Sequence, residues 1–151
     1  MAPVRPVRIL FVCLGNAYRS QMAEGLANRL GRDVLVAESA GLTPLDVLPE
    51  TTLNVMREKG IDISQQFPKA VSAVDLKSYD LVVNMSGLPI PGATPAATRT
   101  WTVPDPVWAG ERMAREVRDE LEGLVMALIL ELRKQRAGEE KPRLHPKLRG
   151  V

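Results

Sequence analysis

The chain is poor in the side chains that build metal, disulfide and stacking sites. Its 151 residues include one cysteine, one histidine and only 4% aromatic residues. A single cysteine excludes a disulfide within the chain. Cys13 and His145 stand far apart, and no group of residues has the spacing of a zinc site. We therefore predict no metal and no cofactor.

Long apolar runs are also missing, and none approaches the length needed to cross a bilayer. The N-terminus is basic and leads into apolar residues, as a signal peptide does, but the run at 9–12 is too short for its hydrophobic core. We therefore expect a cytoplasmic protein that does not bind membranes. The content of 45% apolar and 25% charged residues is typical of a globular domain.

Charge is close to balanced, with a net charge of +2, but the basic residues are unevenly distributed. Seven of them lie between residues 133 and 149, in a segment without any aromatic residue to stack on bases. We expect one domain over 1–137, followed by a basic, flexible tail over 138–151 that does not bind nucleic acid.

Apolar strands and amphipathic helices alternate along the chain. The patterns predict strands at 7–13, 34–39, 81–85 and 100–103, and helices at 20–30, 49–59, 71–79 and about 111–135. Prolines and a glycine within 88–98 predict a loop. Such alternation is typical of an α/β fold. We predict a three-layer α/β/α domain with a four-stranded, mostly parallel sheet.

The lone cysteine ends the first predicted strand and opens a loop that leads into a helix. Ligands of open α/β sheets bind at such strand ends. The helix N-terminus and the guanidinium of Arg19 favour a thiolate at Cys13, and the loop amides favour a bound oxyanion. Gly15 lets the backbone approach that anion, and Asn16 tolerates a positive φ. A buried, inert cysteine is the alternative.

The sequence therefore predicts a phosphate-binding loop directly after the first strand. Ser20 is placed to hydrogen-bond the thiolate of Cys13. The residues predicted to contact the oxyanion are Leu14, Gly15, Asn16, Ala17, Tyr18, Arg19 and Ser20.

Asp105 is the candidate proton donor for a leaving group expelled by that thiolate. It lies between two prolines, which stiffen its segment, and it precedes the last predicted helix. A simple turn or capping aspartate is an equally good interpretation of the residues alone.

Residues 12–20, VCLGNAYRS, resemble the signature loop of the low-molecular-weight protein tyrosine phosphatases, whose superfamily includes thioredoxin-coupled arsenate reductases. Further similarities follow in order at 21–25 (QMAEG), 38–41 (ESAG), 60–64 (GIDIS) and 105–106 (DP). The resemblance runs from residue 7 to about residue 133. It implies that Asp105 is the general acid and that Trp108 forms a wall of the substrate cleft. A tryptophan that packs within the fold is the alternative for Trp108.

The resemblance implies hydrolysis of phosphotyrosine proteins or small aryl phosphates through a cysteinyl-phosphate, with Cys13, Arg19 and Asp105 catalytic. The alternative is a single-cysteine arsenate reductase that uses an external thiol. Ser86 stands where reductases that relay oxidation through their own cysteines carry a second thiol, so that relay is impossible here. A non-catalytic oxyanion-binding module is a third interpretation.

Overall fold

The computed structural model describes residues 5–92 and 97–140. Its sheet has the strand order β2-β1-β3-β4, and every neighbouring pair is parallel. The strands are β1 (Val7–Cys13), β2 (Leu35–Gly41), β3 (Leu81–Asn84) and β4 (Thr98–Thr100). The prediction of an α/β fold around a four-stranded, mostly parallel sheet is confirmed.

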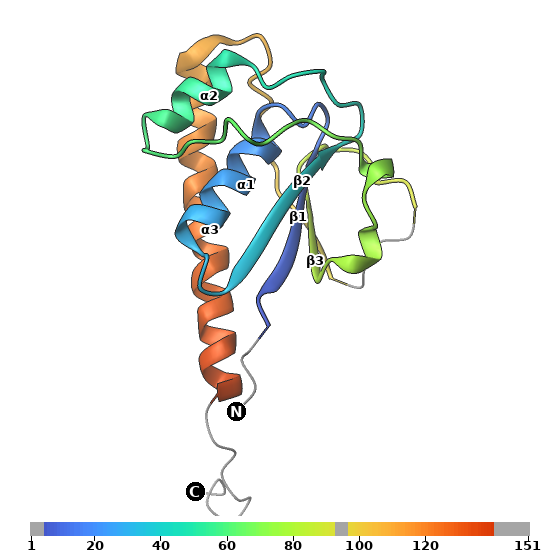
Figure 1. Cartoon of the computed structure of the whole chain (residues 1–151), viewed down its shortest axis with the longest axis vertical. Helices are drawn as coiled ribbons and strands as arrows, with labels where there is room; N and C mark the ends of the chain where they lie inside the picture. The colour runs from blue at the N-terminus through green and yellow to red at the C-terminus, as the bar shows by residue number, and fades with distance from the viewer. Residues whose placement is uncertain (1–4, 93–96, 141–151) are drawn as a thin grey trace, which may run out of the picture.

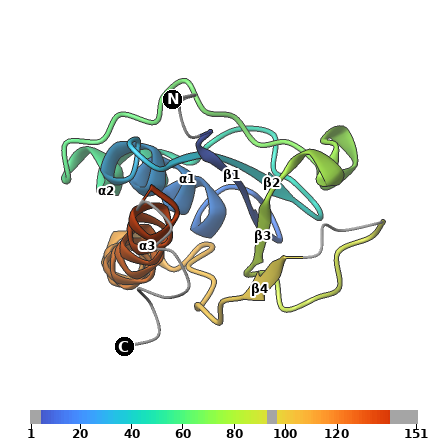
Figure 2. The same cartoon turned by 90° about the horizontal axis from the view of Figure 1, so that it is seen from below.

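The α-helices pack on one face of this sheet (Figures 1 and 2). They are α1 (Arg19–Leu30), α2 (Glu50–Arg57) and α3 (Gly110–Glu140). Side chains alternate along a strand, so Ile9 and Phe11 of β1 join the core beneath these helices. Met22 of α1 and Ile129 of α3 are fully buried in the same core.

The other face of the sheet is covered by two short 3₁₀-helices, η1 (Val71–Ala73) and η2 (Leu76–Ser78). Leu10 and Val12 of β1 pack there against Val71, Leu76 and Tyr79. The single helix predicted over 71–79 is therefore wrong. The backbone is extended at Val74 and Asp75, and the Asp75 carboxylate accepts a hydrogen bond from Lys77 N, which begins a second turn instead of continuing the first.

Other boundaries differ by one or two residues, and the larger differences are at β4 and α3. β4 lies at Thr98–Thr100 rather than at 100–103, because this edge strand pairs through its backbone while its side chains remain exposed. α3 runs on to Glu140, five residues beyond the predicted end, and passes through Gly138. Most of the predicted tail, and the loop residues 93–96, lie outside the described residues, so the division at 137/138 stays a prediction.

The topology gathers loops at the carboxyl ends of the central strands. β1 lies between β2 and β3, with Cys13 paired to Gly41 and Val12 to Asn84. The segments that leave these three strands therefore meet at one edge, which is the upper end of the sheet in Figure 1.

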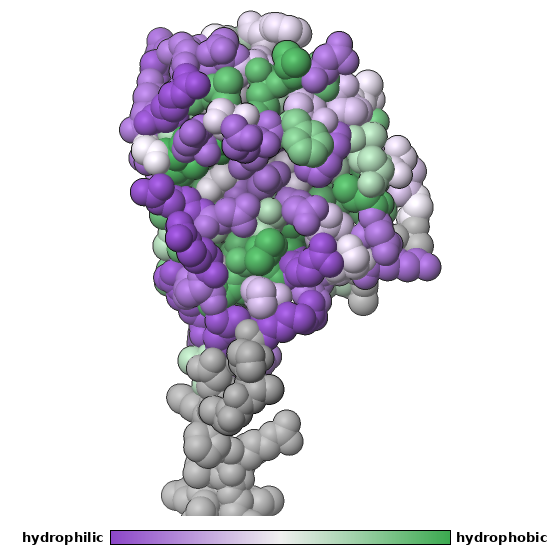
Figure 3. All heavy atoms as spheres, viewed as in Figure 1, coloured by the Kyte–Doolittle hydropathy of each residue, from purple (hydrophilic) through white to green (hydrophobic). Residues whose placement is uncertain are grey.

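The surface is mostly polar in the view of Figure 3, with apolar residues in small separate groups. None of the helices within the described residues is both long and apolar enough to cross a membrane.

Candidate active site

The loop between β1 and α1 is held against the segment that follows β2. Leu42 N donates to the carbonyl of Cys13, Thr43 N to that of Leu14, and Leu45 N to that of Gly15, at 2.8–3.1 Å. A Cβ at Gly41 would lie 2.8 Å from Leu14 O, so only glycine permits this close approach. These bonds occupy the loop carbonyls and leave its N–H groups for a ligand.

The amides of this loop are the groups predicted to bind an oxyanion. Within residues 5–92 and 97–140, the N–H groups of residues 14–18 donate no hydrogen bond to a protein acceptor. Successive unpartnered amides before a helix N-terminus bind phosphate-like anions, because they supply both donors and a positive dipole end.

Asn16 holds the centre of the loop in a left-handed conformation, with φ of 49°. The positive φ foreseen at Asn16 is therefore present. The buried Asn16 Nδ2 donates to Ser20 Oγ at 2.7 Å, and Ser20 Oγ lies 2.9 Å from the Sγ of Cys13. When Cys13 is a thiolate, only Ser20 has a proton to donate in that pair.

Arg19 is 94% buried and offers one edge of its guanidinium to a ligand. Nη1 is engaged by the carbonyls of Met85 at 2.6 Å and Val103 at 3.2 Å. Nε is buried with no partner among the described residues, and Nη2 pairs only with Asp105, at 3.3 Å from Oδ2. The Nε–Nη2 edge is a bidentate fork suited to two oxygens of one anion.

Asp105 reaches the site from the loop between β4 and α3. Its Oδ2 faces Arg19, and its Oδ1 accepts a hydrogen bond from Val107 N at 3.1 Å. About a third of its side chain is exposed. The carboxyl therefore forms the local turn contact given as one alternative, and it also pairs with Arg19 of the predicted anion site, while its role as proton donor stays a prediction.

Cys13 and Asp105 line the same cavity, of about 300 Å³. Leu14, Gly15, Ala17 and Tyr18 come from the loop, and Thr43, Leu45 and Val107 complete the lining. The cavity is therefore small and mainly apolar, and its lining includes one thiol and one carboxyl group.

Trp108 lies outside that cavity, in a neighbouring one of about 580 Å³ that shares Tyr18 and Leu45 with it. The side chain is 83% exposed and its φ is 58°. Its role as a wall of the substrate cleft stays a prediction, which this placement limits to ligands that extend beyond the first cavity.

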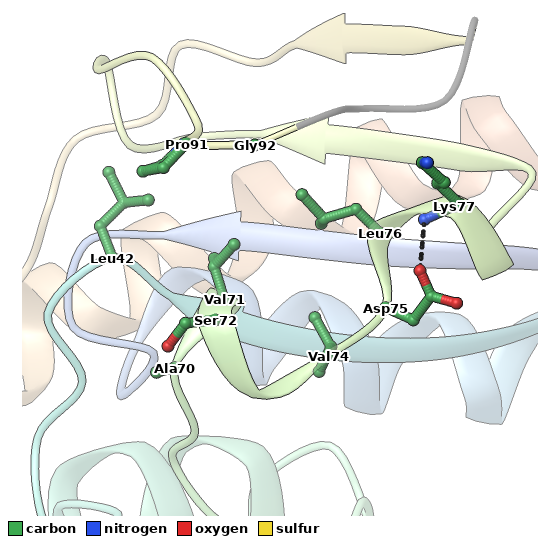
Figure 4. A pocket seen from close by; sticks show the side chains of 10 residues that line it. All are labelled: Leu42, Ala70, Val71, Ser72, Val74, Asp75, Leu76, Lys77, Pro91 and Gly92. Carbon is green, nitrogen blue, oxygen red and sulfur yellow. Dashed lines mark hydrogen bonds between the residues drawn. The ribbon is translucent and has the colours of Figure 1, made fainter.

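A third cavity, of about 470 Å³, lies on the opposite side of the sheet beside η1 and η2 (Figure 4). Aliphatic side chains dominate its lining, and the backbone N–H of Lys77 is bonded to Asp75. It contains none of the predicted site residues and is not continuous with the loop.

Sequence reasoning missed the groups that support the loop from behind. Thr52 Oγ1 donates to Ala17 O at 2.6 Å, and Lys69 N donates to Asn16 Oδ1 at 2.9 Å. Gln21 and Gln66 form a second link to Asn16. The contacts of Thr52, Gln66 and Lys69 span 35 to 53 residues, and no local spacing signals them.

The described residues contain no group of three histidine, cysteine or carboxylate side chains that would hold a metal.

Glu24 accepts a 2.6 Å hydrogen bond from Ser39 between α1 and β2. Burial raises the pKa of Glu24, and the Ser39 hydrogen bond and Lys69 oppose that increase.

The chain matches known proteins over nearly its whole length. Residues 8–138 match the family described as low molecular weight phosphotyrosine protein phosphatase. The glutaredoxin arsenate reductase of Synechocystis sp. is 34% identical over 129 residues, covering 83% of this chain and 98% of that protein. A putative arsenate reductase of Halobacterium salinarum is 35% identical, covering 78% and 87%.

Solved structures from both branches have the same fold. An arsenate reductase in the phosphate binding state matches with a TM-score of 0.77 and 32% identity, covering 83% of this chain and 98% of that one. The low molecular weight protein tyrosine phosphatase of T. tengcongensis matches with 0.73 and 30%, covering 83% and 99%. The chain therefore belongs to the low-molecular-weight protein tyrosine phosphatase and arsenate reductase superfamily.

Proposed function

We propose that this protein is an arsenate reductase in which Cys13 attacks arsenate and an external thiol supplies the electrons. The observation that carries the proposal is the only thiol of the chain, buried at the start of a loop whose amides at 14–18 form no hydrogen bond with the described residues. This loop leads to Arg19, whose buried Nε has no partner among the described residues. Several relatives at 34–37% identity are named arsenate reductases. The sequence favoured hydrolysis, and these relatives favour reduction instead.

The reduction is balanced with two external thiols. Cys13 Sγ bonds to arsenic(V) and one arsenate oxygen leaves as water. An external thiolate then attacks Sγ, the S–As bond breaks, and arsenic takes both electrons and leaves as arsenite. The mixed disulfide on Cys13 is opened by a second thiol, which releases the oxidised thiol and restores Cys13.

The electrons come from outside because the chain has no second cysteine and carries Ser86 two residues after the end of β3. Thiol–disulfide exchange needs access to the attacked sulfur, and Cys13 lines a cavity that opens at the sheet edge. A glutaredoxin, a thioredoxin or a small thiol fits this role, and the name of the Synechocystis relative supports a glutaredoxin.

Phosphate monoester hydrolysis is the second candidate, and Asp105 is the observation that favours it. Its carboxyl lies in the cavity of Cys13, where it would protonate a leaving alkoxide or phenoxide and then activate the water that attacks the cysteinyl-phosphate. Arg19 and the loop amides would stabilise the equatorial oxygens of the transferred phosphoryl group. The family description supports this reaction class.

Both reactions are compared on one preparation, with Cys13→Ser as the control. Arsenite release is measured with arsenate, glutathione and glutaredoxin, and aryl phosphate hydrolysis is measured without metal at mildly acidic pH. Reduction that is lost in Cys13→Ser supports our proposal. Hydrolysis without arsenite release would replace it with the phosphatase, and oxyanion binding without turnover would indicate a binding module.

A further inference from the structure

We propose that Gln66 is a positioning residue for the Cys13 thiolate, acting through Gln21, Asn16 and Ser20. It lies in the segment between α2 and η1 and does not line the cavity of Cys13. The inference rests on the proposed role of Cys13 as nucleophile, and it applies to reduction and hydrolysis alike.

The first link of this chain of contacts joins Gln66 to Gln21 of α1. Gln66 Nε2 donates to Gln21 Oε1 at 2.8 Å and to Gln21 O at 3.1 Å. Binding the amide oxygen of Gln21 fixes which way its terminal group points. Gln21 Nε2 is thereby directed to the carbonyl of Asn16, to which it donates at 3.0 Å.

The second link is the left-handed backbone of Asn16. A non-glycine residue at φ of 49° is maintained by its surroundings, because the conformation is sparsely populated otherwise. Gln21 holds the Asn16 carbonyl, and Lys69 N holds Oδ1 at 2.9 Å. Residues 66 and 69 thus restrain Asn16 through its main chain and its side chain.

The third link passes from Asn16 to the nucleophile. With Oδ1 engaged by Lys69, the Asn16 amide directs Nδ2 to Ser20 Oγ at 2.7 Å. This bond occupies a lone pair of Ser20 and leaves its proton for Cys13 Sγ at 2.9 Å. A donor to the thiolate stabilises it relative to the thiol, so loosening Asn16 reduces the thiolate fraction.

Gln66 is the accessible end of this network. Gln21, Asn16 and Ser20 are fully buried, whereas Gln66 is only partly buried. A substitution there removes the first link without opening the core. The neighbouring Gln65 is exposed and forms no side-chain hydrogen bond within the described residues, so it offers a matched control.

The test is the pH profile of Cys13 alkylation by iodoacetamide, which is unambiguous because the chain has one cysteine. We compare Gln66→Met, which keeps the length but removes the donor, with Gln65→Met. Gln66→Met is expected to move the midpoint of the alkylation profile upward by about half a pH unit. The shift is small because the substitution weakens the hydrogen bond from Ser20 to the thiolate without removing it. Protection by inorganic phosphate should weaken about threefold. Gln65→Met should match the parent.

Ser20→Ala separates positioning from a merely structural effect. If Gln66 acts through Ser20, Gln66→Met adds no further shift in the Ser20→Ala background. A Gln66→Met profile identical to that of Gln65→Met overturns the inference, as does a shift that is equally large without the Ser20 hydroxyl. Alkylation reports the thiol even if neither oxyanion is turned over, so these outcomes are distinct from failure of the proposed function.

Discussion

The loop that carries Cys13 and the loop that carries Asp105 face the same cavity but are held very differently. In the first, Asn16 and Ser20 are fully buried and Arg19 is 94% buried. In the second, Trp108 is 83% exposed and about a third of the Asp105 side chain is exposed. The first loop is hydrogen-bonded to the segment after β2, to α1 and to residue 69. Among the described residues, the Asp105 carboxyl forms polar contacts only with Arg19 and Val107 N.

This contrast assigns different tasks to the two loops. Donors that are fixed before the ligand arrives stabilise an oxyanion without reorganisation, which suits the Cys13 loop. A carboxyl on an exposed loop adapts to leaving groups of different size, which suits Asp105. Changes that loosen the first loop should therefore impair oxyanion binding and thiol chemistry together, and changes in the second should leave the binding of inorganic oxyanions nearly unchanged.

Cys13→Ser should have the largest effect. The hydroxyl is a far weaker nucleophile than a thiolate, so both arsenite release and aryl phosphate hydrolysis should fall by about four decades or more. Phosphate binding, followed by titration calorimetry, should persist because the amides and Arg19 remain. Turnover at the parent rate would remove Cys13 from the mechanism.

Asp105→Asn tests most directly whether the Cys13 loop and the Asp105 loop have separate tasks. Without a proton donor, hydrolysis of an aryl phosphate should slow by about two to four decades in kcat. Phosphate affinity should stay the same or increase, since the carboxylate no longer pairs with Arg19. A loss of phosphate affinity as large as the loss of kcat would show that the two loops are not separable.

Gly41→Ala tests the rigidity of the Cys13 loop. The added Cβ would lie 2.8 Å from Leu14 O and 2.9 Å from Asn16 N, both backbone atoms. We expect about 1–3 kcal/mol lower stability and about tenfold weaker phosphate binding. Gly123→Ala on α3, where a Cβ meets nothing within 4 Å, is the control and should be neutral or stabilising in thermal unfolding. Equal phosphate affinity in the parent and Gly41→Ala would contradict a rigid cradle.

Trp108→Ala should have a smaller and selective effect. Arsenate and phosphate fit within the first cavity, so their KM values should change by no more than about twofold. For an aryl phosphate that extends into the neighbouring cavity, KM should rise about three- to tenfold, because one aromatic contact is lost. An unchanged KM for the aryl substrate would remove Trp108 from the cleft.

Glu58→Gln should affect acid stability and leave both loops unchanged. Hydrogen bonds from Arg115 and then Arg118 lower the pKa of Glu58 from 4.5 to about 2. A depressed carboxyl pKa stabilises the fold above pH 4.5, and this contribution is lost as the pH falls toward 2. The thermal midpoints of the parent and Glu58→Gln should therefore differ at pH 6 and converge near pH 2. Parallel midpoints across this range would contradict the ion-pair account.

The same contrast explains how much could be predicted from sequence. The Cys13 loop is encoded by neighbours in the sequence, because a strand is followed by glycine, asparagine and arginine and then by a helix. Local patterns therefore predicted β1, the start of α1 and the positive φ of Asn16. The support from Gln66, Lys69 and Thr52 comes from far along the chain and had no local signal. Periodicity also failed at 71–79, where the polar Asp75 starts a new turn, and at β4, which is held by its backbone pairing.

The most direct test of the central claim is a single-turnover experiment with excess arsenate and one equivalent of glutathione, so that no second thiol remains to open the mixed disulfide on Cys13. Arsenite and the thiol state of Cys13 are measured in the same samples. Our account predicts one arsenite released for each glutathione mixed disulfide formed on Cys13, and neither product in Cys13→Ser. Robust aryl phosphate hydrolysis with no arsenite and no mixed disulfide would contradict it and leave the phosphatase as the function.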